Sequence, residues 1–288
     1  MSSNILTAIK QISDFKINQI NEFSKKYTRT QINSVRKQIK YYVKDAISGS
    51  LKTEKEKKES EPDKRVFSYL GNKNNPPDMI IKDGDAFIIK IIQTYKSSLT
   101  FTNSPPKDHL NWNDPWILKN CRTVDGGQWT SKDIFYVTGW IEKGKIKYLY
   151  FLHGLCYAAK EEIYNQKIRG LKENIEKYLA AEGLEASKIV DGLGRINKID
   201  PLGITDLRIN GIWKTQNPLR VFSNTYNYDK KQDFMLIALM LKDKFDSFPK
   251  KHIDALTADS QIKLENVKIR NPNNPAKELD AKLVTLSW

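Results

Sequence analysis

The segment from residue 76 to residue 92 combines residue types whose spacing suits phosphodiester hydrolysis. Asp78 follows a Pro-Pro pair, and Lys90 lies in the middle of the apolar run Ala86–Ile92. Such hydrolysis at neutral pH takes a divalent ion, usually Mg²⁺, held by hard oxygen ligands such as carboxylates. A lysine beside the ion stabilises the developing negative charge. Asp78 and Lys90 are therefore candidate catalytic residues on two neighbouring strands.

Position 88 departs from what this chemistry needs. Side chains two residues apart on a strand share a face, so we expect Ile88 and Lys90 to face Asp78 together. A second carboxylate is required there, but the residue is isoleucine. Asp85 is the nearest acid and should lie on the opposite face unless a bulge intervenes. The alternative is an ordinary core strand, which rarely carries a lysine at its centre.

Further local signatures sharpen the interpretation. Pro77-Asp78 with Ile88-Ile89-Lys90 resembles the PD-(D/E)xK nuclease superfamily, with Ile88 at the acidic position. From about residue 30 to the C-terminus, the chain also resembles the NgoPII-type family of type II restriction endonucleases. The segments that carry this resemblance are Gly84-Asp85-Ala86, residues 97–107, Cys121-Arg122, Trp129–Ile134, Gly194–Thr205, Arg208 and Gly211-Ile212-Trp213.

The resemblance implies a homodimeric, Mg²⁺-dependent endonuclease of a bacterial restriction–modification system, located in the cytoplasm. It implies cleavage of a short palindrome, GGCC, in double-stranded DNA that a cognate methyltransferase protects. Asp78 and the backbone carbonyl of Ile89 carry over as metal ligands, and Lys90 carries over as the catalytic lysine. The family glutamate does not carry over to Ile88. Such enzymes also often place a glutamate in the first long helix, where this chain has Lys40.

Three hypotheses therefore stay open at this point. The one we favour is an endonuclease that binds its target but cleaves poorly, because isoleucine cannot ligate Mg²⁺. The second is an active endonuclease that takes its second acid from elsewhere in the chain. The third is a basic, non-enzymatic nucleic-acid-binding protein unrelated to restriction.

Two polar loops are candidates for DNA contacts. Arginine pairs with guanine, and asparagine or glutamine pairs with adenine. Arg195 and Arg208 are the guanine readers that we expect for a G/C target, although both could equally be phosphate contacts or ordinary loop residues. The first segment supplies Ser97, Ser98, Asn103, Ser104 and Lys107, and the second supplies Arg195, Asn197, Lys198 and Arg208.

Composition agrees with a DNA partner. The chain has 48 Lys plus Arg against 34 Asp plus Glu, a net charge of +14, which suits phosphate neutralisation. An AT-rich genome could produce the same surplus. Cys121 and Cys156 form no disulfide framework, which fits a reducing compartment. No 18-residue apolar run and no signal-peptide pattern occur, so we expect no membrane contact.

The order of elements predicts an α/β protein with a mixed central β-sheet flanked by helices, a restriction-endonuclease-like core and a helical N-terminal part. Residues 1–50 are expected to form a helical subdomain, 51–65 a charged linker or loop, and 66–288 the nuclease core with its recognition loops. A helix is predicted over 158–181 and a hairpin turn over 142–145. Strands are predicted over 79–81, 86–93, 134–141, 146–153, 219–222, 234–241, 264–269 and 283–286.

Overall fold

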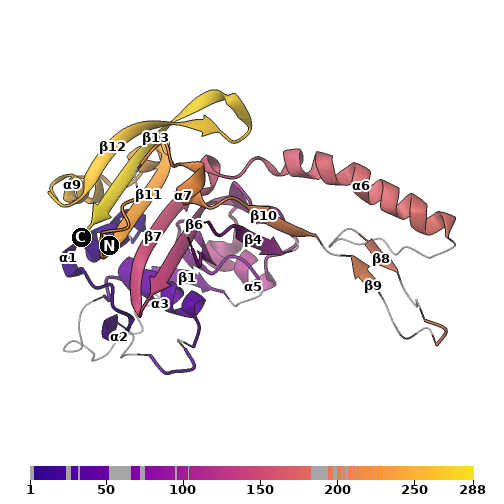
Figure 1. Ribbon diagram of the computed structural model, residues 1–288, viewed down its shortest axis with the longest axis horizontal. Helices are drawn as coiled ribbons and strands as arrows, with labels where there is room; N and C mark the ends of the chain where they lie inside the picture. The colour runs from indigo at the N-terminus through magenta and orange to yellow at the C-terminus, as the bar shows by residue number, and fades with distance from the viewer. Residues whose placement is uncertain are drawn as a thin grey trace.

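A computed structural model describes residues 3–288 except 24–26, 32, 52–65, 72–74, 95, 103, 183–193, 197–199, 203, 205–206, 210 and 227. Helices flank a mixed sheet, so the predicted α/β class is confirmed (Figure 1). Most of the charged segment 51–65 lies outside the described residues. The division into subdomain, linker and core therefore stays a prediction. None of the helices in the described part of the chain is long and apolar enough to cross a membrane.

The nine-stranded sheet has the order β1-β2-β3-β6-β7-β11-β13-β12, with β5 paired to β6. The β3–β6 and β7–β11 pairs are parallel, and the other pairs are antiparallel. Its strands are β1 (Phe67–Leu70), β2 (Met79–Ile81), β3 (Ala86–Ile91), β5 (His109–Asn111), β6 (Ser131–Glu142), β7 (Lys145–His153), β11 (Met235–Leu241), β12 (Lys263–Asn271) and β13 (Asn274–Ser287).

The N-terminal segment is helical, as predicted, and its helices cover one face of the sheet. They are α1 (Ile5–Phe15), α2 (Ile20–Phe23) and α3 (Val35–Ser48). Asn4 caps α1 by accepting bonds from the backbone N–H groups of Leu6 and Thr7. Side chains of α1 and α3 share a hydrophobic cluster with Phe87 and Ile89 of β3. The helices α8 (Lys242–Asp246) and α9 (Lys250–Thr257) contribute to the same cluster.

A second hydrophobic cluster covers the opposite face and contains Ile88 of β3. It includes residues from β4 (Leu99–Thr102), α5 (Lys119–Arg122) and α7 (Pro218–Val221), and β4 pairs with β10 (Ile212–Thr215). Short 3-10 turns, η3 (Val124–Gly127) and η4 (Gly154–Cys156), connect these elements. Because Ile88 and Ile89 belong to opposite clusters, the alternation expected along β3 is confirmed.

Two of the segments that differ from the sequence prediction border the second hydrophobic cluster. The strand predicted over 219–222 is wrong, because α7 occupies this segment. Asn217 caps this helix by accepting a bond from the Leu219 N–H at 3.1 Å, and Pro218 stands in its first turn. The polar segment 97–107 is not loop throughout, because Leu99–Thr102 form β4 with Leu99 and Phe101 buried.

The predicted long helix is present as α6 (Glu161–Ala181). It extends away from the sheet toward the small β8 (Gly194–Ile196) and β9 (Leu207–Ile209) pair (Figure 1). The predicted turn between β6 and β7 is also present. Lys143 and Gly144 both adopt positive φ there, as a tight hairpin turn requires.

Candidate active site

Asp78 is held at the start of β2, directly against β3. Its backbone N–H donates to the Phe87 carbonyl at 2.8 Å. Its side chain is only 1% exposed, and Oδ2 accepts a 2.8 Å bond from the Ile89 N–H. The carboxylate is therefore fixed by the backbone of the neighbouring strand.

Two cations of α3, one helical turn apart, reach this carboxylate. Arg36 Nη2 lies 2.6 Å from Asp78 Oδ1, and Lys40 Nζ lies 3.9 Å from the same atom. Lys40 also donates to the Gly71 carbonyl at 2.6 Å, and Arg36 Nε donates to the Ile89 carbonyl at 3.4 Å. Burial raises the pKa of Asp78, and the charges of Arg36 and Lys40 oppose that rise. Burial disfavours the charged form of Lys40 as well, and therefore lowers the pKa of this lysine.

Lys90 projects from β3 on the same face as Ile88. Its Nζ donates to the Thr100 carbonyl at 2.8 Å and lies 4.0 Å from the centre of the Phe101 ring. Burial lowers the pKa of Lys90 to about 8, although the charge of Asp78 opposes this fall. Such a lysine can exchange a proton near neutral pH more readily than an exposed one.

Asp78, Ile88 and Lys90 line one cavity of about 440 Å³. Its far wall includes Asp114, which follows β5 and is only 3% exposed. Lys107 Nζ lies 2.6 Å from Asp114 Oδ2 and 3.3 Å from a carboxylate oxygen of Glu161, at the start of α6. Sequence reasoning missed Asp114, whose only local signal is its place between two tryptophans in the Trp-Asn-Asp-Pro-Trp segment.

The cavity thus joins a buried carboxylate, a lysine of lowered pKa and several cations. Comparison of the whole chain with known proteins identifies its family. The family model described as NgoPII restriction endonuclease matches residues 3–270. The chain belongs to the NgoPII restriction endonuclease family. Over 285 residues it is 36% identical to the type II restriction enzyme NgoPII of Neisseria gonorrhoeae, covering 98% of this chain and 99% of that enzyme. No solved structure matches.

Membership of the NgoPII family assigns the chain to the type II site-specific deoxyribonucleases. The restriction–modification setting expected from the sequence is thereby supported, and the interpretation as an unrelated basic binding protein is not. The mixed sheet flanked by helices agrees with a restriction-endonuclease-like core.

The donor set around Asp78 does not fit the Mg²⁺ site that the resemblance implies. Mg²⁺ requires several hard oxygen ligands. The chain presents the Asp78 carboxylate and the Ile89 carbonyl, and Arg36 donates to both. Ile88 lines the cavity with a hydrocarbon side chain. Among the described residues, no three His, Cys, Asp or Glu side chains are grouped so that they could hold a metal ion.

Asp85 does not supply the missing acid. It lies at the other end of β3, where Lys244 Nζ contacts its Oδ1 at 2.6 Å and Asp133 Oδ2 at 2.7 Å. His153 Nε2 also lies 3.1 Å from Asp133 Oδ1, within this separate ion cluster. Asp85 therefore links the start of β3 to α8 through Lys244. This position agrees with the expectation that Asp85 lies away from the face of Ile88 and Lys90.

The predicted DNA-contacting residues lie in different parts of the structure. Ser104 and Lys107 line the cavity of Asp78, whereas Ser98 is exposed and Ser97 Oγ accepts a 2.9 Å bond from the Thr94 N–H within its own turn. Arg195 and Arg208 occupy directly paired positions of β8 and β9. Asn103, Asn197 and Lys198 lie outside the described residues. The DNA-contacting roles of all these residues stay predictions.

Proposed function

We propose that this chain recognises the palindrome GGCC in double-stranded DNA as a homodimer, and that its cleavage of that site is impaired at Ile88. The family relative is named a type II restriction enzyme, which supports a duplex DNA target. A palindrome is matched most simply by two copies of one chain related by a two-fold axis. A cytoplasmic location and a methyltransferase that protects the same site follow from this assignment.

The observation that carries the proposal is the lining of the cavity around Asp78. Asp78, Ile88 and Lys90 line the same cavity, and Ile88 adds no ligand and no negative charge to it. Arg36 and Lys40 instead place positive charge beside the remaining carboxylate. This balance favours binding of an anionic phosphate, whereas retention of Mg²⁺ is disfavoured. The expected result is a protein that binds its site tightly and cuts it slowly.

The test is cleavage of a plasmid with several GGCC sites by the wild-type chain, Ile88→Glu and Ile88→Gln in Mg²⁺. A glutamate at position 88 would face Lys90 and supply the missing ligand, so we expect a rate gain of roughly 100-fold or more. Ile88→Gln has nearly the same shape without the charge and should stay as slow as wild type. Sedimentation of the wild-type chain with a GGCC duplex in EDTA should give two chains per duplex.

Asp114 gives a specific second possibility. Of the residues that line this cavity in the described part of the chain, it is the other carboxylate beside Asp78. If wild type and Ile88→Glu cut at similar rates, Asp114→Asn should abolish cleavage, and the proposal of impairment is wrong. If none of the variants cuts, then the placement of the catalytic residues is wrong.

A further inference from the structure

The helix α6 is built for contact outside its own subunit. Of its 21 residues, Leu179 alone is buried. At 1.5 Å per residue the helix is roughly 30 Å long, and it extends away from the sheet (Figure 1). A helix that buries so little surface gains little stability from the core of its own subunit.

The base of α6, in contrast, is firmly attached to the core. The Tyr164 hydroxyl accepts a 3.1 Å bond from the Ala159 N–H, and its ring packs edge-on against Trp213 of β10 at 5.7 Å. Glu161 pairs with Lys107, which also holds Asp114 in the catalytic cavity. The direction of the helix is therefore fixed relative to Asp78 and Lys90.

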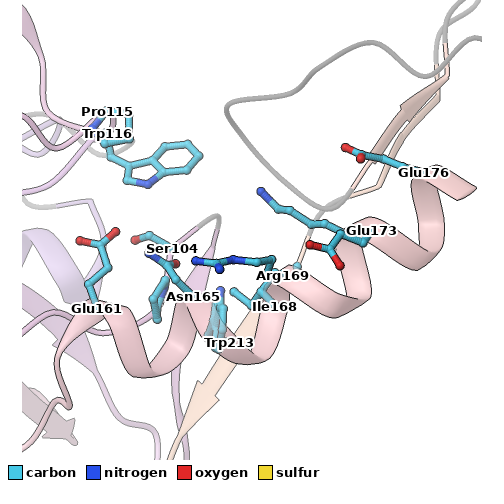
Figure 2. A pocket seen from close by; sticks show the side chains of 13 residues that line it. Ser104, Pro115, Trp116, Glu161, Asn165, Ile168, Arg169, Glu173, Glu176 and Trp213 are labelled. Atoms are coloured by element: carbon cyan, nitrogen blue, oxygen red, sulfur yellow. The ribbon is translucent and has the colours of Figure 1, made fainter.

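A second cavity, of about 510 Å³, runs along α6. It shares Ser104, Pro105, Pro115 and Trp116 with the cavity of Asp78, so the two adjoin. Figure 2 shows the side chains of one side of α6 directed into this space beneath Trp116. This face of α6 comprises Asn165, Ile168, Arg169, Lys172, Glu173 and Glu176.

The polar residues on this face are available to a ligand. Asn165, Arg169 and Glu173 are exposed, and in the part of the chain that the structure describes none of their side chains forms a hydrogen bond or ion pair. Arg169 and Glu173 are one helical turn apart, so their side chains are neighbours along the cavity. They present a guanidinium and a carboxylate side by side.

This mixture favours base edges over phosphates as the ligand. A surface that contacts only phosphates would exclude Glu173 and Glu176, because carboxylates repel phosphate oxygens. Base edges in the major groove can bind both cationic and anionic side chains. Arginine donates to guanine O6 and N7, and glutamate accepts from cytosine N4. The major groove, about 12 Å wide, also admits one α-helix. A target made only of G·C pairs presents guanine O6 and N7 and cytosine N4 at every base pair.

We propose that α6 enters the major groove beside the scissile phosphate, and that Arg169 and Glu173 read guanine and cytosine there. The inference rests on the proposed function, because it presupposes a G·C target in duplex DNA. It adds a recognition element to the segments expected from the sequence. The ligand is the G·C major-groove edge of a duplex whose backbone reaches the cavity of Asp78.

The test compares Arg169→Ala with Lys167→Ala by fluorescence anisotropy in EDTA, using a GGCC duplex and a GCGC duplex. Lys167 is exposed, absent from the cavity lining and on the opposite side of α6, so it is the matched control for lost charge. We expect Arg169→Ala to weaken GGCC binding roughly 10- to 100-fold and to leave GCGC binding nearly unchanged. Glu173→Ala should reduce the same preference.

An equal loss of affinity for both duplexes would assign Arg169 to the phosphates and overturn the inference. An effect no larger than that of Lys167→Ala would also overturn it. Measurements on the wild-type chain distinguish failure of the inference about α6 from failure of the proposed function. If wild type binds both duplexes alike, the proposed GGCC recognition fails and base reading by α6 fails with it. If wild type discriminates and Arg169→Ala discriminates equally, the inference about α6 fails alone.

Discussion

At the scale of single residues, Lys90 carries a charge that the fold makes costly. Burial lowers the pKa of Lys90 from 10.5 to about 8 in the folded chain. Below pH 8 the amine is protonated in both states, and folding must partly desolvate it. Between pH 8 and 10.5 it is neutral in the folded chain and still protonated in the unfolded one. The contribution of Lys90 to stability is therefore unfavourable at low pH and becomes less so as the pH rises.

Replacing Lys90 by methionine tests this linkage. Below pH 8 we expect Lys90→Met to have the larger free energy of unfolding, by on the order of 3 kcal/mol at most. The gap should narrow as the pH rises toward 10.5, because the wild-type amine then no longer loses solvation as a cation. Urea unfolding at several pH values measures the gap, and an exposed control, Lys167→Met, should show no such trend. A gap that stays constant with pH would contradict the lowered pKa.

The residues of the site were only partly predictable. Asp78 and Lys90 follow from strand alternation, because a two-residue period determines which side chains share a face. Arg36 does not, because its contact with Asp78 depends on how α3 crosses the sheet. Asp114 likewise reaches the cavity from a loop that carries no periodic signal. Local patterns identified the residues on the strands and missed those that tertiary packing brings to them.

At the scale of elements, one glycine sets the distance between α3 and the sheet. A Cβ built at Gly139 of β6 would lie 2.7 Å from Ile39 Cδ1 and 2.9 Å from Ile39 Cγ1. Ile39 and Arg36 lie on neighbouring turns of α3, so this close packing also determines how Arg36 reaches Asp78. The helix α3 can therefore pack this close to β6 only because residue 139 has no side chain.

We expect Gly139→Ala to lower the free energy of unfolding by about 1–3 kcal/mol, because the added methyl group overpacks the core. Ile39→Val removes Cδ1 and should restore part of this loss in the double variant. Gly170→Ala is the control, since nothing lies within 4 Å of a Cβ there and alanine favours the helix. Thermal unfolding of wild type and of each variant measures these differences, and a Gly139→Ala chain as stable as wild type would contradict the packing argument.

Elements were predictable where their pattern was long and regular. The strands β6, β7 and β11 and the helix α6 have clear periods, and all were identified from them. The short segment 219–222 was not, because its apolar residues fit a strand as well as a turn of helix. The Asn217-Pro218 pair was the deciding signal, since asparagine caps and proline begins helices. The orientation of α6 away from the core depends on contacts at its base that no periodicity records.

At the scale of the whole molecule, a charge of +14 would attract any nucleic acid, so binding alone does not demonstrate recognition. Salt separates the two contributions. Phosphate contacts release counterions, so the affinity for every duplex should fall steeply as salt rises. Base contacts add a nearly salt-independent preference. For a restriction endonuclease that retains its target, the ratio of affinities should therefore persist when the absolute affinities fall.

We expect the wild-type chain in EDTA to bind a GGCC duplex at least roughly 1,000-fold more tightly than a scrambled duplex of equal length. The slope of log affinity against log salt should be similar for both duplexes, because the phosphates are common to them. Fluorescence anisotropy between 50 and about 200 mM salt measures both quantities over the range in which such contacts weaken. Equal affinities for both duplexes at every salt concentration would instead describe a basic protein that binds charge without reading sequence. In that case the chain would lack sequence-specific DNA binding as well as the acidic residue that cleavage requires at position 88.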